Sequence, residues 1–271
     1  RSACHLRRLP IWSGMRGRTI ALSVVGVFVV LFVGTQIAMH VLKAELPQVR
    51  RAGPEADALA RKIEAAVRVD AWAETGAVSF RFIKNEHLWD RRRQRARIRF
   101  GKKEVWVDLS THRGIAKKEG QTLSGTSAEQ TIAEAERVFY NDTFWLNPLG
   151  KMFDEGVLRE KVALTDEPAG SEGLLVSYTK GGVTPGDAYL WIVDREGRPF
   201  AWRIWTAVFP IKGIRMSWDQ WSAQPTGALI SLERHFPGVT IHISDLVSAR
   251  TLEELVTGPD PFALLEAEPA P

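Results

Sequence analysis

Residues 87–100 read HLWDRRRQRARIRF, and this stretch decides the fold class because its second half alternates with a period of two. Apolar side chains fall at even positions from Ala96 to Phe100, and arginines fall at the odd positions between them. Successive side chains of a strand point to opposite faces. The pattern therefore predicts a β-strand with a buried apolar face and an outward row of arginines. That row comprises Arg95, Arg97 and Arg99.

The arginine run is a candidate contact for phosphates, which basic side chains neutralise. Sites for single-stranded nucleic acid, however, interleave aromatic and basic groups on one face. Here Ile98 and Phe100 lie on the face opposite to the arginines. We therefore predict no nucleic-acid partner, and we expect Arg95, Arg97 and Arg99 to rest in water or against an anionic membrane surface.

The same period of two continues on both sides of this stretch, and helical patterns interrupt it twice. Apolar residues four apart predict a helix over about 55–70, and a second helix is expected from Ser127 to near Asn141. A short third helix is expected from Thr251, where Glu254 has capping-box spacing. Strands are predicted at about 78–82, 95–100, 104–109, 113–118, 159–165, 173–180, 187–194, 199–207, 212–221 and 239–244. This order is typical of an α+β fold in which one large, curved antiparallel sheet, a half-open β-barrel, carries helices on its concave side.

The N-terminal part reads as a membrane segment. Residues 20–42 hold no Asp, Glu, Lys or Arg and are long enough to span a bilayer. We predict a basic tail over 1–18 (of which 1–14 could precede a start at Met15), a transmembrane anchor or signal over 19–42, a linker over 43–54, one domain over 55–258 and a disordered tail over 259–271. We expect an inner-membrane protein with its C-terminal domain in the periplasm, or a periplasmic protein after signal cleavage.

The search for catalytic and metal-binding patterns gives little. The single cysteine, Cys4, excludes an intrachain disulfide and a multi-cysteine zinc site. No phosphate-binding glycine loop or G-x-S-x-G motif is present. His87 and Asp90 are the nearest pair to an acid–base couple, but residues three apart on a strand point to opposite faces. We expect no metal, no cofactor and no catalytic residue.

The ten tryptophans suggest a different kind of site. Tyr189 and Trp191 share one strand face, as do Phe200 and Trp202, and several strands carry apolar bulk on both faces. One face could pack on helices while the other lines a cavity for an apolar ligand. An ordinary core with two apolar sides remains the alternative. The candidate cavity residues are Phe80, Phe82, Trp191, Trp202 and Trp218.

Three stretches resemble a group of bacterial exported domains whose function is not assigned. They are NDTFWL at 141–146, LWDRRRQRARIRF at 88–100 and YLWIVDREGRPFAWRIW at 189–205. Those domains in turn resemble the LolA and LolB type of lipoprotein carrier, a half-open antiparallel barrel with helices over its mouth. The resemblance covers about residues 54–250 and implies a hydrophobic cavity. The functional cavity arginine of the carriers cannot be assigned to a position in this chain, because no carrier motif matches around any one arginine.

Together these observations predict a non-enzymatic, membrane-anchored envelope protein that binds a lipid or acyl chain in a half-barrel. An envelope protein–protein interaction or sensor module with a filled core is the alternative. A hydrolase using His87 and Asp90 is a second alternative, and it requires these two side chains to converge in a cleft.

Overall fold

The computed structural model describes residues 44–48, 50–180, 186–207 and 212–267. The chain divides into two compact units, residues 1–44 and 45–271. The predicted segment 19–42 lies outside the described residues. Among the residues that are described, no helix is both long and apolar enough to cross a bilayer.

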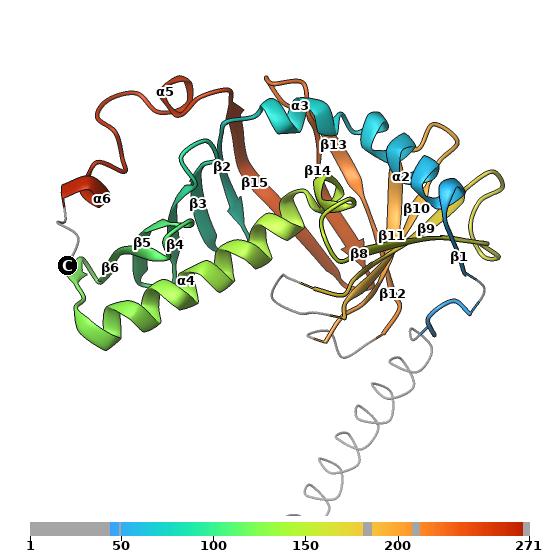
Figure 1. The fold of residues 1–271 in the computed structure, drawn as a ribbon, viewed down its shortest axis with the longest axis horizontal. Helices are drawn as coiled ribbons and strands as arrows, with labels where there is room; N and C mark the ends of the chain where they lie inside the picture. The colour runs from blue at the N-terminus through green and yellow to red at the C-terminus, as the bar shows by residue number, and fades with distance from the viewer. Residues whose placement is uncertain (1–43, 49, 181–185, 208–211, 268–271) are drawn as a thin grey trace, which may run out of the picture. The chain divides into compact units, whose positions relative to one another are not determined.

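Residues 45–271 form an α+β unit with two antiparallel sheets (Figure 1). Neither sheet closes into a barrel. The larger sheet has the order β13-β14-β15-β2-β3-β4-β5-β6-β7, and the smaller has the order β1-β8-β9-β10-β11-β12. The strands of the larger sheet are β2 (Ala77–Phe82), β3 (Asn85–Asp90), β4 (Arg95–Phe100), β5 (Lys103–Asp108), β6 (Arg113–Lys118), β7 (Gln121–Thr122), β13 (Asp219–Ala223), β14 (Leu229–Phe236) and β15 (Val239–Ala249). Those of the smaller sheet are β1 (Arg50–Ala52), β8 (Val157–Val162), β9 (Glu172–Tyr178), β10 (Ala188–Val193), β11 (Pro199–Trp205) and β12 (Ile214–Ser217).

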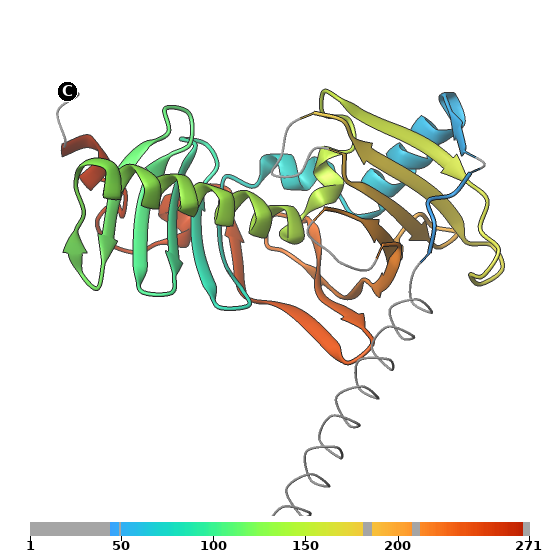
Figure 2. The ribbon, with the colours of Figure 1, turned by 90° about the horizontal axis from the view of Figure 1, so that it is seen from below.

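The helices cover one face of the smaller sheet and parts of both faces of the larger sheet (Figures 1 and 2). They are α2 (Pro54–Ala66), α3 (Val69–Glu74), α4 (Gly125–Leu146), the 3₁₀ turn η1 (Pro148–Lys151), α5 (Leu252–Leu255) and α6 (Leu264–Ala267). α2 places Leu59 and Ile63 against the smaller sheet. α4 places Ile132, Ala135 and Phe139, which are three or four residues apart, against β4, β5 and β6.

The chain passes from one sheet to the other at Trp218, the single residue between β12 and β13. Its N–H still donates to the carbonyl of Phe200, at 2.8 Å, so the chain remains hydrogen-bonded to β11 up to the point where it changes sheet. Trp218 itself is only 2% exposed. The junction of the sheets is therefore held by a buried aromatic side chain.

Several element predictions need correction. Residues 85–90 form strand β3, and residues 229–236 form strand β14, which was not expected. Residues 212–221 are two strands, because the chain changes sheet at Trp218. The middle helix α4 begins at Gly125 without a side-chain cap and continues to Leu146, beyond the predicted end near Asn141. The predicted capping box of Thr251 and Glu254 is confirmed only in part, since Thr251 accepts the Glu254 N–H, whereas Glu254 accepts the N–H of Arg250 and not that of Thr251.

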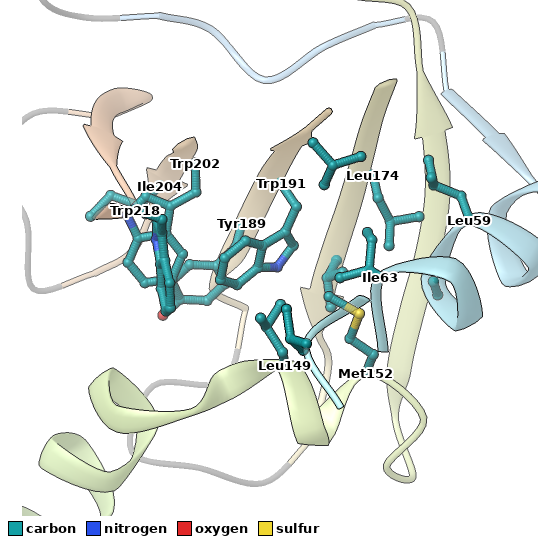
Figure 3. Packing of buried hydrophobic residues seen from close by; sticks show 14 of the residues in the cluster. Leu59, Ile63, Leu149, Met152, Leu174, Tyr189, Trp191, Trp202, Ile204 and Trp218 are labelled. Carbon is teal, nitrogen blue, oxygen red and sulfur yellow. The ribbon is translucent and has the colours of Figure 1, made fainter. Parts of the chain in front are cut away.

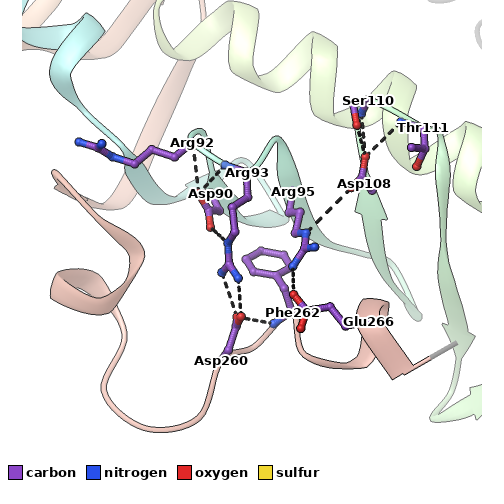
Figure 4. Close-up of polar contacts among 10 residues, drawn as sticks. All are labelled: Asp90, Arg92, Arg93, Arg95, Asp108, Ser110, Thr111, Asp260, Phe262 and Glu266. Atoms are coloured by element: carbon purple, nitrogen blue, oxygen red, sulfur yellow. Dashed lines mark hydrogen bonds and ion pairs between the residues drawn. The ribbon is translucent and has the colours of Figure 1, made fainter.

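The predicted disordered tail is wrong for residues 259–267. Phe262 is fully buried against Leu88 and Trp106, on the face of the larger sheet opposite to α4. Both terminal nitrogens of Arg93 donate hydrogen bonds to the Asp260 carboxylate, and Arg95 pairs with Glu266 at 2.8 Å (Figure 4). A composition rich in Pro, Ala and Glu suggested disorder, but one aromatic anchor and two ion pairs fix this segment.

Candidate functional site

Three of the predicted cavity residues come together in one aromatic cluster (Figure 3). Trp191 of β10 lies 4.9 Å from Trp202 of β11, measured between ring centroids. Trp218 lies 4.8 Å from the first ring and 5.0 Å from the second. All three side chains are at most 2% exposed. Antiparallel pairing of β10 with β11 sets Trp191 directly opposite Trp202, so the cluster follows from strand register.

Phe80 and Phe82 lie in a second cluster, with α3 and β15. Trp145, near the end of α4, joins the two clusters, because its ring lies 5.8 Å from Phe82 and 5.4 Å from Trp202. Phe80 and Phe82 are 2% and 4% exposed. The five side chains expected to line a cavity are therefore packed against other side chains in this structure, and they do not border open space.

Arg234 is the one charged side chain inside this aromatic core that sequence reasoning missed. It is 0% exposed, and its Cζ lies 3.7 Å from the centroid of Trp218. Its Nη1 donates to the carbonyl of Ser231 at 2.7 Å, and its Nη2 donates to the carbonyl of Trp145 at 2.9 Å. The second bond satisfies a carbonyl of the last turn of α4, where the helix dipole favours a cation.

No carboxylate forms an ion pair with Arg234 in the described part of the chain. Burial without a counter-ion opposes the charged form and lowers the pKa of Arg234 to about 9, although Asp219 acts in the other direction. A period-two reading of 229–236 would have found this residue, because Arg234 takes an inward position in line with Ile230. An arginine at a core position of a strand is unusual and marks a functional candidate.

Four N–H donors of this core have no hydrogen-bond partner among the described residues. They are the indole Nε1 atoms of Trp191, Trp202 and Trp218 and the Nε atom of Arg234. A buried donor without an acceptor costs about 1–3 kcal/mol, and native proteins leave few such groups. The cluster therefore offers large apolar surfaces together with donors that oxygen atoms of a ligand would satisfy.

A buried polar pair holds the C-terminal part of α4 on the larger sheet. The Nε2 atom of His87 lies 2.8 Å from Asp142 Oδ2, and the side chains are 0% and 3% exposed. Asn85 donates to the same oxygen at 2.8 Å. The sequence search paired His87 with Asp90, but its partner is Asp142 of the NDTFWL segment. The distance of 55 residues along the chain hid this pair from sequence reasoning.

His87 and Asp90 do not converge. Asp90 lies on the opposite face of β3, where its carboxylate accepts N–H groups of residues 92 and 93 and contacts the Arg93 side chain at 2.6 Å (Figure 4). His87 stacks on Phe80 under α4. The arrangement that the hydrolase alternative requires is therefore absent from β3, as the strand spacing indicated.

The arginine row lies on the face opposite to Ile98 and Phe100, as predicted, but it does not simply face water, because the C-terminal segment covers part of this face and the arginines are engaged by carboxylates. Arg99 contacts Glu104 at 2.7 Å and Glu86 at 3.4 Å. Arg97 lies 3.9 Å from Glu104, and Arg95 pairs with Glu266. These contacts come from the neighbouring strands and from the C-terminal segment. The row is thus largely neutralised within the molecule, which weakens it as a contact for anionic lipid.

Two histidines that lie seven residues apart in sequence meet at one carboxylate. His235 Nε2 and His242 Nδ1 each lie 3.1 Å from Glu233, because His242 is opposite Glu233 in the β14–β15 pair. All the same, no three His, Cys, Asp or Glu side chains among the described residues are placed to hold a metal ion.

No protein-family model matches the chain, and no curated protein has significant sequence similarity to it.

Proposed function

We propose that residues 45–271 form a non-enzymatic, membrane-anchored envelope domain that binds a lipid or other amphiphile at the aromatic core of Trp191, Trp202, Trp218 and Arg234. The four unpartnered donors in an apolar setting carry this proposal. An acyl chain would pack on the indole rings, and oxygen atoms of its head group would accept from the donors. Burial of the chain would contribute roughly 25 cal/mol per Å² before ordering costs.

Ligand entry requires movement of α4, because the core is filled when α4 is in place. The bond from Arg234 to the Trp145 carbonyl and the pair of His87 with Asp142 hold the C-terminal part of this helix. Displacing the Trp145 ring would separate the two aromatic clusters and open space beside Trp202. A ligand oxygen would then replace the Trp145 carbonyl as the acceptor for Arg234.

The test is a titration with palmitate, followed by tryptophan fluorescence, on the fragment 45–271, which contains all five hydrophobic clusters. Wild type should bind, and Arg234→Met should bind at least about 10-fold more weakly, because it removes one charged hydrogen bond of about 1.5–3 kcal/mol. Arg91→Met is the matched control. Arg91 is a half-buried arginine with no carboxylate partner among the described residues and an unpartnered Nε atom, and it stacks on Trp72 and Trp89 away from the cluster. Absence of wild-type binding, or equal loss in both variants, would refute the proposal.

A second candidate function is an interaction or sensor module for an envelope protein, and the dense packing of the five predicted cavity residues favours it. This candidate needs no ligand in the core. It predicts that Arg234→Met leaves partner binding unchanged, whereas surface substitutions abolish it. Recovery of the lipid-free protein with an intact fold, together with no palmitate uptake, would favour this candidate over the first.

The membrane anchor and the periplasmic location of the domain are part of the proposal and are tested separately. A C-terminal alkaline phosphatase fusion to the full chain should be active in a bacterial host. An inactive fusion would place the domain in the cytoplasm.

A further inference from the structure

The tips of three hairpins gather at one end of the larger sheet. They are the turns of β2–β3 at Ile83 and Lys84, of β4–β5 at Gly101 and Lys102, and of β6–β7 at Glu119 and Gly120. Side chains or backbone from each turn line a shallow hollow of about 280 Å³. In Figure 2 these tips point toward the bottom of the picture, and the tip of the β14–β15 hairpin points the same way.

This hollow is rich in cations. Its lining holds five basic side chains and two carboxylates, namely Lys84, Arg99, Lys102, Lys103 and Lys117 with Glu86 and Glu104. Lys84 has no ion pair among the described residues. Lys102 pairs with Glu119, but both side chains are more than half exposed, and such pairs are weak in water. Arg99 pairs with Glu86 and Glu104, and Lys103 pairs with Glu134 at 2.5 Å, so the positive charge at the hairpin tips comes from Lys84 and the exposed Lys102.

Ile83 is the least expected residue at this end. It is 62% exposed, and its φ of 56° is in the left-handed region. A β-branched residue in this region is a true outlier, since glycine or asparagine would be less strained there. An exposed apolar side chain also contributes nothing to the stability of the fold. Val239, at the tip of the β14–β15 hairpin, is a second exposed β-branched residue, at 47%.

We propose that these hairpin tips dock on the surface of an anionic phospholipid bilayer, with Ile83 entering the head-group layer and Lys84 and Lys102 against the phosphates. Interfacial binding combines buried apolar area with attraction of lysines to anionic lipids. This proposal rests in part on the membrane anchor of the proposed function, which would keep the domain close to a bilayer. Leu46 packs on the smaller sheet, and the four residue steps from Leu42, the end of the predicted membrane segment, span at most about 14 Å.

The experiment measures co-sedimentation of fragment 45–271 with two kinds of vesicle, pure phosphatidylcholine and an equal mixture with phosphatidylglycerol. Wild type should sediment with the mixed vesicles only. Lys84→Glu/Lys102→Glu should lower its partition coefficient at least about 10-fold. Ile83→Asn should lower it about 5-fold or more, while its melting temperature stays equal or rises, because asparagine tolerates the left-handed turn.

Arg113→Glu/Arg137→Glu is the matched control, because it changes the charge by the same amount at two exposed positions away from the tips. It should keep at least half of the wild-type partitioning. Equal loss in this control would show general electrostatic attraction and overturn the docking site. No sedimentation of wild type with the mixed vesicles, or unchanged partitioning of Ile83→Asn, would overturn it as well. Palmitate binding by the same variants should be unaffected, which separates this proposal from the one on the aromatic core.

Discussion

At the scale of single residues, the arginines that are shielded from solvent are more informative about function than the exposed ones. Arg234 is fully buried and Arg91 is half-buried, neither pairs with a carboxylate in the described part of the chain, and each donates to a carbonyl at the end of a helix. Burial lowers the pKa of Arg234 to about 9 and that of Arg91 to about 10. A charge held in an apolar core against its solvation preference favours a functional reason for its presence.

Arg234→Met is expected to stabilise the fold by about 1–4 kcal/mol at pH 7, as replacing a buried ion with an apolar side chain often does. The folded-state pKa lies well below the ordinary arginine value of the unfolded chain, so the unfolded chain binds more protons above pH 9. Wild-type stability from this group therefore rises as the pH passes through 9. Thermal melts at pH 7 and pH 10 should show a smaller gap between variant and wild type at pH 10. A constant gap would contradict the lowered pKa of Arg234, because it would mean that the folded and unfolded states keep the same charge up to pH 10.

Asp142→Ala is expected to lower the free energy of unfolding by about 2–5 kcal/mol, because it leaves the buried His87 and the half-buried Asn85 without their shared acceptor. Asn141→Ala is the control, since Asn141 also donates to Asp142 but from a more exposed position. Urea unfolding should show a loss of less than about 1.5 kcal/mol for this control. Equal losses in the two variants would mean that the pair is not what holds α4 on the sheet.

At the scale of elements, local register decides which side chains reach the core. Phe200 and Trp202 were expected on one face of β11, but a bulge between Ile192 and Val193 shifts the pairing. Trp202 then joins the core beneath α2, while Phe200 packs on the other face of the sheet. A bulge leaves no signature in the period of hydrophobic residues, so the sequence could not show this exchange.

The C-terminal segment provides the prediction at this scale. Phe262→Ala should cost about 3–5 kcal/mol at a fully buried site and release residues 259–267 from the sheet. Asp260→Asn should cost less than about 1 kcal/mol, since its ion pair with Arg93 is partly exposed. Hydrogen exchange of the Ala263 and Leu265 amides would report the release. Protection retained in Phe262→Ala would show that the ion pairs alone suffice.

At the scale of the whole molecule, the α+β class and most strands follow from hydrophobic period, because Ala96, Ile98 and Phe100 can be buried together only on a strand. The period of hydrophobic residues could not predict side-chain contacts between segments that are far apart in the sequence. The contacts of His87 with Asp142 and of Arg234 with Trp145 join segments 55 and 89 residues apart. The five residues predicted to line a cavity lie in the interior, packed against other side chains, and only strand register and the crossing at Trp218 explain why three of them meet.

Native mass spectrometry of fragment 45–271 purified from a bacterial host tests the central claim, lipid binding at the aromatic core, most directly. We predict a non-covalent adduct of lipid mass that solvent extraction removes and that is absent from Arg234→Met but present in Arg91→Met. A bare protein mass for wild type, with no uptake of a fluorescent fatty acid, would contradict the claim.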